Sequence, residues 1–247
     1  MTKLLVNEVF GPTWQGEGIS AGQHCLFVRL ALCNLECEWC DTAQTWAFTQ
    51  KKADTHRSHI LYDRDQELHH MTPEEVIAEL EKLWPIRQRP TIIVISGGEP
   101  LMQKLALPKL LQLLYEMDCD VQIETAGTLV PDPEIDVYVY QYNVSPKLEN
   151  SGNPLGKRRK HLALQFFSNR QNAFFKFVCR DDVDLCEVDE IVRDFNIPFD
   201  RVQIMPEGVD EGTIMDTAYY LADEVLKRGY GMTLRNHIFI FGNVRGV

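Results

Sequence analysis

Three cysteines lie close together in the stretch CNLECEWCDT, which runs from Cys33 to Thr42. Thiols grouped in this way bind zinc, form a redox pair or hold an iron–sulfur cluster. Structural zinc takes four protein ligands, and a redox Cys-x-x-Cys would use only Cys37 and Cys40. A [4Fe–4S] cluster uses all three thiolates and leaves one iron open for a non-protein ligand. The spacing therefore favours a cluster held by Cys33, Cys37 and Cys40, with a zinc-stabilised binding module as the alternative.

Four further short motifs each follow a run of β-branched and aromatic residues. SGGEP begins at Ser96, ETAG at Glu124, SPK at Ser145 and MPEG at Met205. Two glycines let the backbone approach a ligand closely, and a carboxylate beside them can hold an ammonium group. Taken singly, each motif also fits an ordinary turn or a solvated side chain. Together they predict a polar rim, because the chemistry of parallel α/β folds lies at the carboxyl ends of the strands.

The elements that would position these motifs are strands alternating with amphipathic helices. The strands are predicted at 25–32, 91–96, 121–125, 137–145, 174–178 and 202–206. The helices are predicted at 72–84, 107–117, 186–195 and 215–229, the first opening with a capping box of Thr72 and Glu75. This alternation predicts an α/β fold with a mostly parallel sheet. The units are too few for eight, so we expect a partial (incomplete) βα barrel in a single domain, residues 1–247.

One stretch, residues 49–70, is polar and shows no periodicity. We interpret it as a long surface insertion that follows the cysteine loop, because long structureless connections are often lids or binding loops. Its four histidines could suggest a metal site, but scattered solvated histidines are the favoured interpretation. They are His56, His59, His69 and His70.

Composition limits the class of protein. The chain has 247 residues, of which 45% are hydrophobic and 25% charged, as expected for a globular protein with a real core. Its formal net charge of -11 argues against nucleic acid as a partner, although a local basic pocket for a small anion remains open. Seven cysteines, with three clustered, indicate a reducing cytoplasm rather than a disulfide framework. The start resembles no signal peptide and no apolar run reaches membrane-spanning length, so we expect no membrane partner.

The spacing Cys33-x-x-x-Cys37-x-x-Cys40, with an aromatic residue before the last cysteine, resembles the radical S-adenosylmethionine (SAM) superfamily. That resemblance implies that the amino and carboxyl groups of SAM chelate the open iron. One electron then splits the sulfonium to give a 5′-deoxyadenosyl radical. The superfamily's fold is an incomplete βα barrel of the kind that the element order predicts.

A narrower resemblance comes from an ordered set of motifs. EVFGPTWQGEG (8–18), FVRL (27–30), CDT (40–42) and RNH (235–237), together with the four strand-end motifs, are similar to the 7-carboxy-7-deazaguanine synthase family. The family resemblance implies a carbon–nitrogen lyase that contracts the ring of 6-carboxy-5,6,7,8-tetrahydropterin and releases ammonia. The reaction uses SAM as a regenerated cofactor, is assisted by Mg²⁺ and belongs to the biosynthesis of queuosine-type 7-deazapurines.

The same resemblance implies a role for each matching residue. Cys33, Cys37 and Cys40 would ligate the cluster, and Thr42 would coordinate Mg²⁺ through its hydroxyl. The implied substrate-binding residues are Trp14, Gln15, Gly16, Glu17, Arg29, Ser96 and the terminal Val247. The implied SAM-binding residues are Trp39, Cys40, Asp41, Gly98, Glu99, Ser145, Pro146, Lys147, Met205, Pro206, Glu207 and Gly208.

Arg29 also has an argument from the strand pattern. Leu26, Val28 and Leu30 alternate with Phe27 and Arg29, which places the arginine on the face opposite the aliphatic set. In a barrel strand that face is the lumen, where a guanidinium would bind the substrate carboxylate in a bidentate pair. The alternative is a strand arginine that reaches the surface.

The expected partners are the small pterin substrate, an electron donor such as flavodoxin or ferredoxin, and a second copy of the chain in a homodimer. One rival function is a radical SAM activase that installs a glycyl radical on a partner protein. Such an activase shares the cysteine loop and the short barrel, but it has no need for the QGEG stretch, for CDT or for an arginine that clamps the substrate.

Overall fold

The computed structural model describes residues 2–84 and 91–247, which form one nine-stranded sheet in the order β3-β1-β2-β4-β5-β6-β7-β8-β9. The strands are β1 (Leu4–Trp14), β2 (His24–Leu30), β3 (His69–Met71), β4 (Ile92–Gly97), β5 (Asp120–Thr125), β6 (Val139–Val144), β7 (Ala173–Cys179), β8 (Val202–Pro206) and β9 (Gly231–Met232). From β2 to β9 all neighbours pair in parallel, whereas β1 pairs antiparallel with both β2 and β3. The sheet is curved and does not close, as the predicted partial barrel requires.

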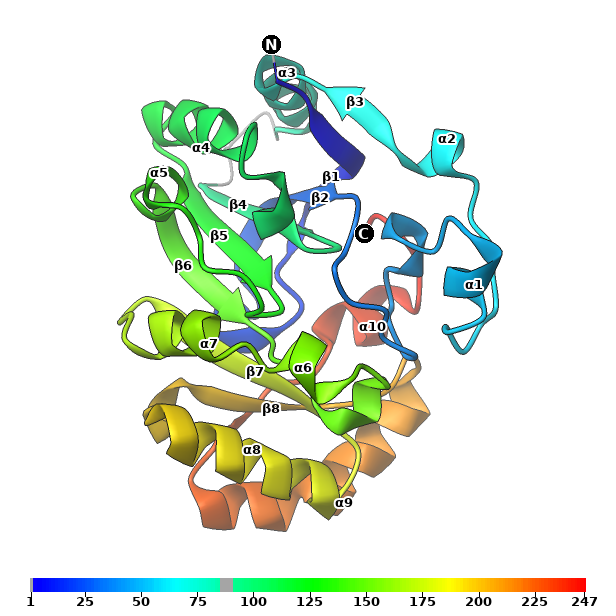
Figure 1. The fold of residues 1–247 in the computed structure, drawn as a ribbon, viewed down its shortest axis with the longest axis vertical. Coiled ribbons are helices and arrows are strands. Elements are labelled where there is room, and N and C mark those ends of the chain that lie inside the picture. Colours follow the sequence, from blue (N-terminus) through cyan, green and yellow to red (C-terminus); the bar gives the residue numbers. More distant parts are fainter. Residues whose placement is uncertain (1, 85–90) are drawn as a thin grey trace.

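Helices surround this sheet, and most of them lie on its outer face. They are α1 (Gln50–Ala53), α2 (Arg64–Glu67), α3 (Pro73–Leu83), α4 (Leu107–Glu116), α5 (Pro133–Asp136), α6 (Leu155–Arg158), α7 (His161–Ser168), α8 (Asp182–Phe195), α9 (Glu211–Arg228) and α10 (Asn236–Phe241). In Figure 1, α3, α4, α5, α7, α8 and α9 follow the outside of the curve, while α1 and α10 lie on its open side. None of the described helices is long and apolar enough to cross a membrane.

The main core lies between the sheet and the outer helices. Leu26, Val28 and Leu30 of β2 are fully buried there, together with Val76 and Leu80 of α3. Their burial confirms the alternation read from the sequence, which leaves the other side chains of β2 for the inner face. The predicted capping box is also present, because Glu75 N donates to Thr72 Oγ1 at 3.2 Å and Thr72 N donates to Glu75 Oε2 at 2.7 Å.

All six predicted strands and all four predicted helices are present, within a few residues at their ends. The long first strand, β1, was not predicted. Gly11 and Pro12 lie in the middle of it, and its pairing with β2 shifts register twice. A Gly-Pro pair and two irregularities break the alternation by which a strand is recognised in a sequence.

The segment 49–70 is more ordered than the sequence suggested. It contains α1 and α2 and enters β3, which adds an antiparallel strand beside β1. The segment is bonded to the cysteine loop, since Arg57 N donates to Glu38 O at 2.9 Å. It is therefore a folded support for that loop and not a structureless connection.

The prediction of solvated histidines is correct for three of the four and wrong for His56. His59, His69 and His70 are exposed. The His56 side chain is only 6% exposed, and its Nε2 donates to the carbonyl oxygen of Cys40 at 2.7 Å. His56 was missed because a hydrogen bond to a backbone carbonyl leaves no periodic signal in the sequence.

Candidate active site

A cavity of about 400 Å³ opens on the inner face of the sheet, at the carboxyl ends of the parallel strands. The cysteine loop, the end of β1 and the last residues of the chain complete its wall. The structure brings most of the predicted site residues to this wall: Trp14, Gln15, Gly16, Glu17, Arg29, Cys33, Cys37, Trp39, Cys40, Asp41, Thr42, Ser96, Gly98, Ser145, Lys147, Met205 and Val247.

Five predicted SAM contacts do not line the cavity, namely Glu99, Pro146, Pro206, Glu207 and Gly208. Glu99 is fully buried, and its carboxylate accepts hydrogen bonds from Ala126 N at 2.8 Å and from Thr125 Oγ1 at 2.9 Å. Burial raises the pKa of Glu99 in spite of these donors. Glu99 therefore fixes the end of β5 beside the cavity, whereas the sequence suggested that its carboxylate would face a ligand.

Glu207 and Gly208 instead hold neighbouring segments in place. Glu207 accepts from Arg57 Nη1 at 2.8 Å, which joins the segment 49–70 to the end of β8. The carbonyl of Gly208 accepts from Arg235 Nη1 at 2.7 Å. Of the MPEG motif, only Met205 reaches the cavity wall.

The three cysteines of the loop after β2 all line the cavity, and none forms a disulfide. Each sulfur accepts one N–H group: Cys33 from Leu35 N, Cys37 from Asn153 Nδ2 and Cys40 from Trp46 Nε1. Burial raises the pKa of Cys37 to about 12 and also raises the pKa of Cys33. A cationic iron centre would hold these groups as thiolates, and the N–H donors suit the anionic sulfurs of such a cluster.

Gly98 lets β4 end directly against the cysteine loop. Its amide donates to Leu30 O at 3.0 Å, and a Cβ atom at this position would lie 2.0 Å from Leu32 O and 3.1 Å from Cys33 Cβ. No other residue type fits so close to a neighbouring backbone. The sequence predicted a close approach to a ligand, and the structure adds a close approach to the loop that carries the cysteines.

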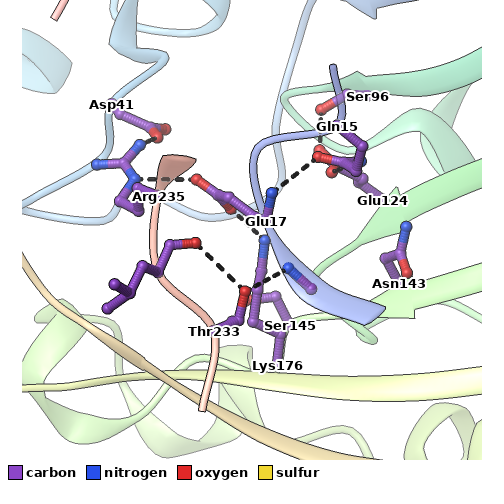
Figure 2. A network of polar contacts seen from close by, with 12 residues as sticks. Gln15, Glu17, Asp41, Ser96, Glu124, Asn143, Ser145, Lys176, Thr233 and Arg235 are labelled. Atoms are coloured by element: carbon purple, nitrogen blue, oxygen red, sulfur yellow. Dashed lines mark hydrogen bonds and ion pairs between the residues drawn. The ribbon is translucent and has the colours of Figure 1, made fainter. Parts of the chain in front are cut away.

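A polar row crosses the inner face of the sheet. Arg29 of β2 pairs in register with Ser96 of β4, and Glu124 of β5 pairs with Asn143 of β6. Ser96 Oγ donates to Glu124 Oε2 at 2.6 Å, and Gln15 Nε2 donates to the other oxygen at 3.1 Å, as Figure 2 shows. The inner-face position predicted for Arg29 is confirmed. Its Nε is 2.6 Å from Glu8 Oε1, a partner that the sequence did not indicate.

A buried ion network forms a second side of the cavity. Glu17 lies between Lys176 and Arg235, and Arg235 also pairs with Asp41 (Figure 2). The Nε of Arg235 is 2.9 Å from Glu17 Oε1. Burial alone would raise the pKa of Glu17, but the charges of Lys176 and Arg235 hold that pKa well below its ordinary value. Glu17 is therefore a carboxylate at neutral pH.

Lys176 was missed at the level of sequence, although a signal was present. In the strand AFFKFVC, Phe175 and Phe177 alternate with Lys176 and are fully buried in the core. A lysine that alternates with two core residues must lie on the inner face of the same strand. Arg235, within the quoted motif RNH, is likewise only 6% exposed.

Thr42 follows the last cysteine at the edge of the cavity. Its Oγ1 lies 3.5 Å from Cys40 Sγ, and its backbone oxygen accepts from Thr45 Oγ1 at 2.7 Å. The hydroxyl therefore lies beside the sulfur of Cys40 and makes no capping hydrogen bond to the 3₁₀ helix η2 (Ala43–Thr45) that follows it.

The last residues of the chain return to the cavity. Residues 243–247 contribute to its wall. Arg245 bonds to Glu8 Oε2 at 2.9 Å and to Glu67 Oε2 at 2.8 Å, which ties the C-terminal segment to β1 and to α2. Val247 consequently lies at the cavity, where its predicted contact with a substrate would form.

The unclosed parallel sheet and its cysteine loop define a radical SAM enzyme, and the sequence model described as the radical SAM superfamily matches residues 29–140. The chain is 33% identical over 245 residues to the 7-carboxy-7-deazaguanine synthase of Pyrobaculum aerophilum, which covers 99% of this chain and 97% of that protein. It is 32% identical over 244 residues to the synthase of Hyperthermus butylicus, with 97% and 93% covered. The chain belongs to the 7-carboxy-7-deazaguanine synthase family.

A solved structure agrees with the fold. The crystal structure of QueE from Escherichia coli matches with a TM-score of 0.69 at 24% identity, covering 96% of each chain. Membership of the radical SAM superfamily implies a [4Fe–4S] cluster and SAM. Family membership, with the iron–sulfur cluster that it implies, replaces the zinc-stabilised binding module that the cysteine loop alone left open.

Proposed function

We propose that this chain converts 6-carboxy-5,6,7,8-tetrahydropterin into 7-carboxy-7-deazaguanine by a SAM-dependent radical ring contraction assisted by Mg²⁺, with release of ammonia. The product is the 7-deazapurine core of queuosine-type nucleosides. One observation carries the proposal: a single cavity joins the cysteine triad to a wall on which Arg29 of β2 and Glu124 of β5 lie on either side of β4. A carboxylated pterin presents matching groups, an anionic carboxylate and a ring edge rich in N–H donors.

In this proposal the SAM-binding side of the cavity is the cysteine loop with the end of β6. Cys33, Cys37 and Cys40 would hold the cluster, which together with bound SAM would supply radical chemistry at this side of the cavity. Trp39, Asp41, Gly98 and Met205 would line the bound SAM. Lys147 Nζ lies 2.9 Å from Ser145 Oγ and 5.5 Å from the centre of the Trp39 ring, so a cation, a hydroxyl and an aromatic face meet at one point.

The substrate would lie against the opposite side. Arg29 would bind the pterin carboxylate, and its present partner Glu8 holds the guanidinium at the wall. The Glu124 carboxylate accepts hydrogen bonds from Ser96 and Gln15. These two donors hold the carboxylate in place, where it would accept from N–H groups of the pterin ring. Trp14, Gly16, Glu17 and the carboxylate of Val247 would complete the contacts.

Mg²⁺ would bind at Thr42, beside the cluster. Mg²⁺ prefers oxygen ligands and keeps several waters, so one protein hydroxyl together with substrate oxygens forms a reasonable site. There it would hold the substrate carboxylate and stabilise developing negative charge. The proposal also includes a low-potential electron donor of the flavodoxin or ferredoxin class, a homodimer and a cytoplasmic location.

The decisive experiment is an anaerobic assay of the reconstituted protein with the carboxypterin, SAM, Mg²⁺ and dithionite. We expect 7-carboxy-7-deazaguanine by mass spectrometry, many turnovers per SAM and a rate that depends on Mg²⁺. Cleavage of SAM without any deazaguanine product would show that the substrate assignment is wrong. A reaction that proceeds equally in the presence of a Mg²⁺ chelator would remove the metal from the proposal.

A further inference from the structure

The cluster-binding cysteines receive hydrogen bonds from two buried side chains that belong to other parts of the chain. Trp46 Nε1 donates to Cys40 Sγ at 3.3 Å, and Asn153 Nδ2 donates to Cys37 Sγ at 3.2 Å. We propose that Trp46 and Asn153 set the reduction potential of the [4Fe–4S] cluster by donating these hydrogen bonds to its thiolate ligands. The inference needs the cluster that superfamily membership implies, and it is independent of the pterin substrate.

Trp46 is held so that its N–H points at one sulfur. The side chain is 1% exposed and packs with Ala43 and Ala47 in a small cluster next to Cys33 and Cys40. The ring of His56 meets the indole edge-on, with 6.2 Å between the ring centres. Because His56 is itself bonded to the carbonyl of Cys40, the indole and the cysteine are fixed to the same support.

Asn153 is oriented by a bond to its other amide atom. Its Oδ1 accepts from the backbone N–H of Glu36 at 2.9 Å, a group that only an acceptor can satisfy. The Nδ2 must therefore face Cys37 Sγ, and the assignment of the two amide atoms follows from the hydrogen bonds. The side chain is 6% exposed, so water does not replace this donor freely.

These bonds act on the potential because reduction adds negative charge near the sulfurs. One electron from an external low-potential donor takes the cluster from the 2+ to the 1+ state, and each N–H···S bond is stronger in the more negative state. Hydrogen bonds to the sulfurs are one of the factors that set the potential of such clusters. The third donor, Leu35 N to Cys33 Sγ at 3.4 Å, is a backbone group that no substitution of Leu35 removes. Trp46 and Asn153 are therefore the side-chain N–H donors that a substitution can remove, and the Thr42 hydroxyl, 3.5 Å from Cys40 Sγ, is unchanged in both variants.

The test compares the variants Trp46→Phe and Asn153→Leu with the wild type, each reconstituted anaerobically and analysed for iron. Trp46→Phe keeps an aromatic ring and removes the N–H, whereas Asn153→Leu keeps a similar volume. The matched controls are Trp84→Phe, at the end of α3 and packed on the main core, and Asn169→Leu, an exposed residue at the end of α7. Redox titration with dithionite, followed by the electron paramagnetic resonance signal of the reduced cluster, gives the midpoint potential without substrate or turnover.

We expect each site variant to retain four irons per chain and to be harder to reduce. At the potential where the wild type is half reduced, the ratio of reduced to oxidised cluster should fall about three- to tenfold, and tenfold corresponds to about 59 mV for a one-electron couple. Both control variants should have the same midpoint potential as the wild type. A fully loaded site variant whose titration coincides with that of the wild type would overturn the proposal for that residue. A folded variant that no longer binds iron would also overturn it, because the residue would then be needed for cluster binding.

Discussion

The guanidinium of Arg235 is ion-paired with the carboxylate of Asp41, the residue that directly follows Cys40. The two residues are 194 positions apart in the sequence, and Arg235 also bonds to Glu17 at the end of β1. The side chain of Arg235 is only 7% exposed. One cation therefore joins the segment before α10, the end of β1 and the cysteine loop at a single buried point.

Removing that cation should destabilise the protein strongly. Arg235→Leu leaves the buried carboxylate of Glu17 without one of its two cations and the exposed carboxylate of Asp41 without its partner, and breaking a buried ion pair from one side costs about 3–5 kcal/mol. Urea unfolding of the cluster-free protein measures the loss. The control Arg193→Leu removes an exposed arginine whose Nε lies 3.6 Å from Asp194, and it should change the free energy of unfolding by less than about 0.5 kcal/mol. Similar losses in both variants would contradict the structural role of Arg235.

The pH dependence of stability should report on Glu17. Although burial opposes its charge, Lys176 and Arg235 keep its pKa in the folded state below the ordinary value of 4.5. Below about pH 4.5 the Glu17 carboxylate takes up a proton in the unfolded chain but not in the folded chain. Its contribution to the free energy of unfolding is therefore fully present above that pH and is lost as the pH falls. We expect the melting temperature of the wild type to fall more steeply between pH 6 and pH 3 than that of Glu17→Gln.

The exposed residue Glu134 provides the control for this titration. Glu134→Gln should keep the pH profile of the wild type. If Glu17→Gln also keeps that profile, the carboxylate of Glu17 is not held in its charged form by the two cations.

Much of this site could be predicted because period-two alternation fixes the face of a strand. Arg29 lies on the inner face because Leu26 and Val28 are buried on the outer one. The same alternation places Lys176 on the inner face, because Phe175 and Phe177 on either side of it are buried in the core. The grouping of the three cysteines at the cavity was predictable for another reason: they lie on one short loop, so their spacing is visible in the sequence.

The misplaced residues depend on geometry that spacing does not carry. Glu99 lies two residues after Gly97, whose positive φ of 132° breaks the strand alternation, and its carboxylate accepts from Leu101 N and Ala126 N at the ends of β4 and β5 instead of facing the cavity. His56 and Asn153 reach the cysteine loop from segments 16 and 116 residues away from their partners Cys40 and Cys37. Such contacts follow only from the folded chain.

Gly98 should be essential for the cysteine loop. The methyl group of Gly98→Ala would lie 2.0 Å from Leu32 O, so the backbone that leads to Cys33 must move. We expect iron bound per chain after reconstitution to fall by about half or more, with a loss of stability of about 1–3 kcal/mol. Gly156→Ala is the control, because a methyl group there meets no atom within 4 Å and lies in a helix. Full iron loading of Gly98→Ala would show that the loop tolerates the displacement.

Arg29 should contribute to substrate binding through the shape of its guanidinium. A lysine keeps the charge but lacks the fork that matches a carboxylate. We expect Arg29→Lys to raise the KM for the carboxypterin about tenfold, equivalent to about 1.4 kcal/mol, with a smaller effect on kcat. The exposed Arg64 on α2 serves as the control, and Arg64→Lys should leave both constants unchanged. An unchanged KM in Arg29→Lys would mean that the substrate carboxylate binds elsewhere.

The hydroxyl of Thr42 should determine the dependence on Mg²⁺. It lies 3.5 Å from Cys40 Sγ and is the only oxygen that the side chain offers to a metal. Thr42→Ser keeps this oxygen and should retain most of the activity, with a half-saturating Mg²⁺ concentration within about threefold of the wild type. Thr42→Ala should lose at least about tenfold in rate and recover part of it only at higher Mg²⁺.

Iron content separates this effect on Mg²⁺ from damage to the neighbouring cluster, since both variants should bind as much iron as the wild type. Thr55→Ala, in the supporting segment 49–70, provides a threonine control that should not alter the Mg²⁺ dependence. The serine and alanine variants differ in one oxygen atom. If their rates and their Mg²⁺ dependences are the same, that oxygen does not bind the metal, and Mg²⁺ must be held by the substrate and by other groups of the cavity wall.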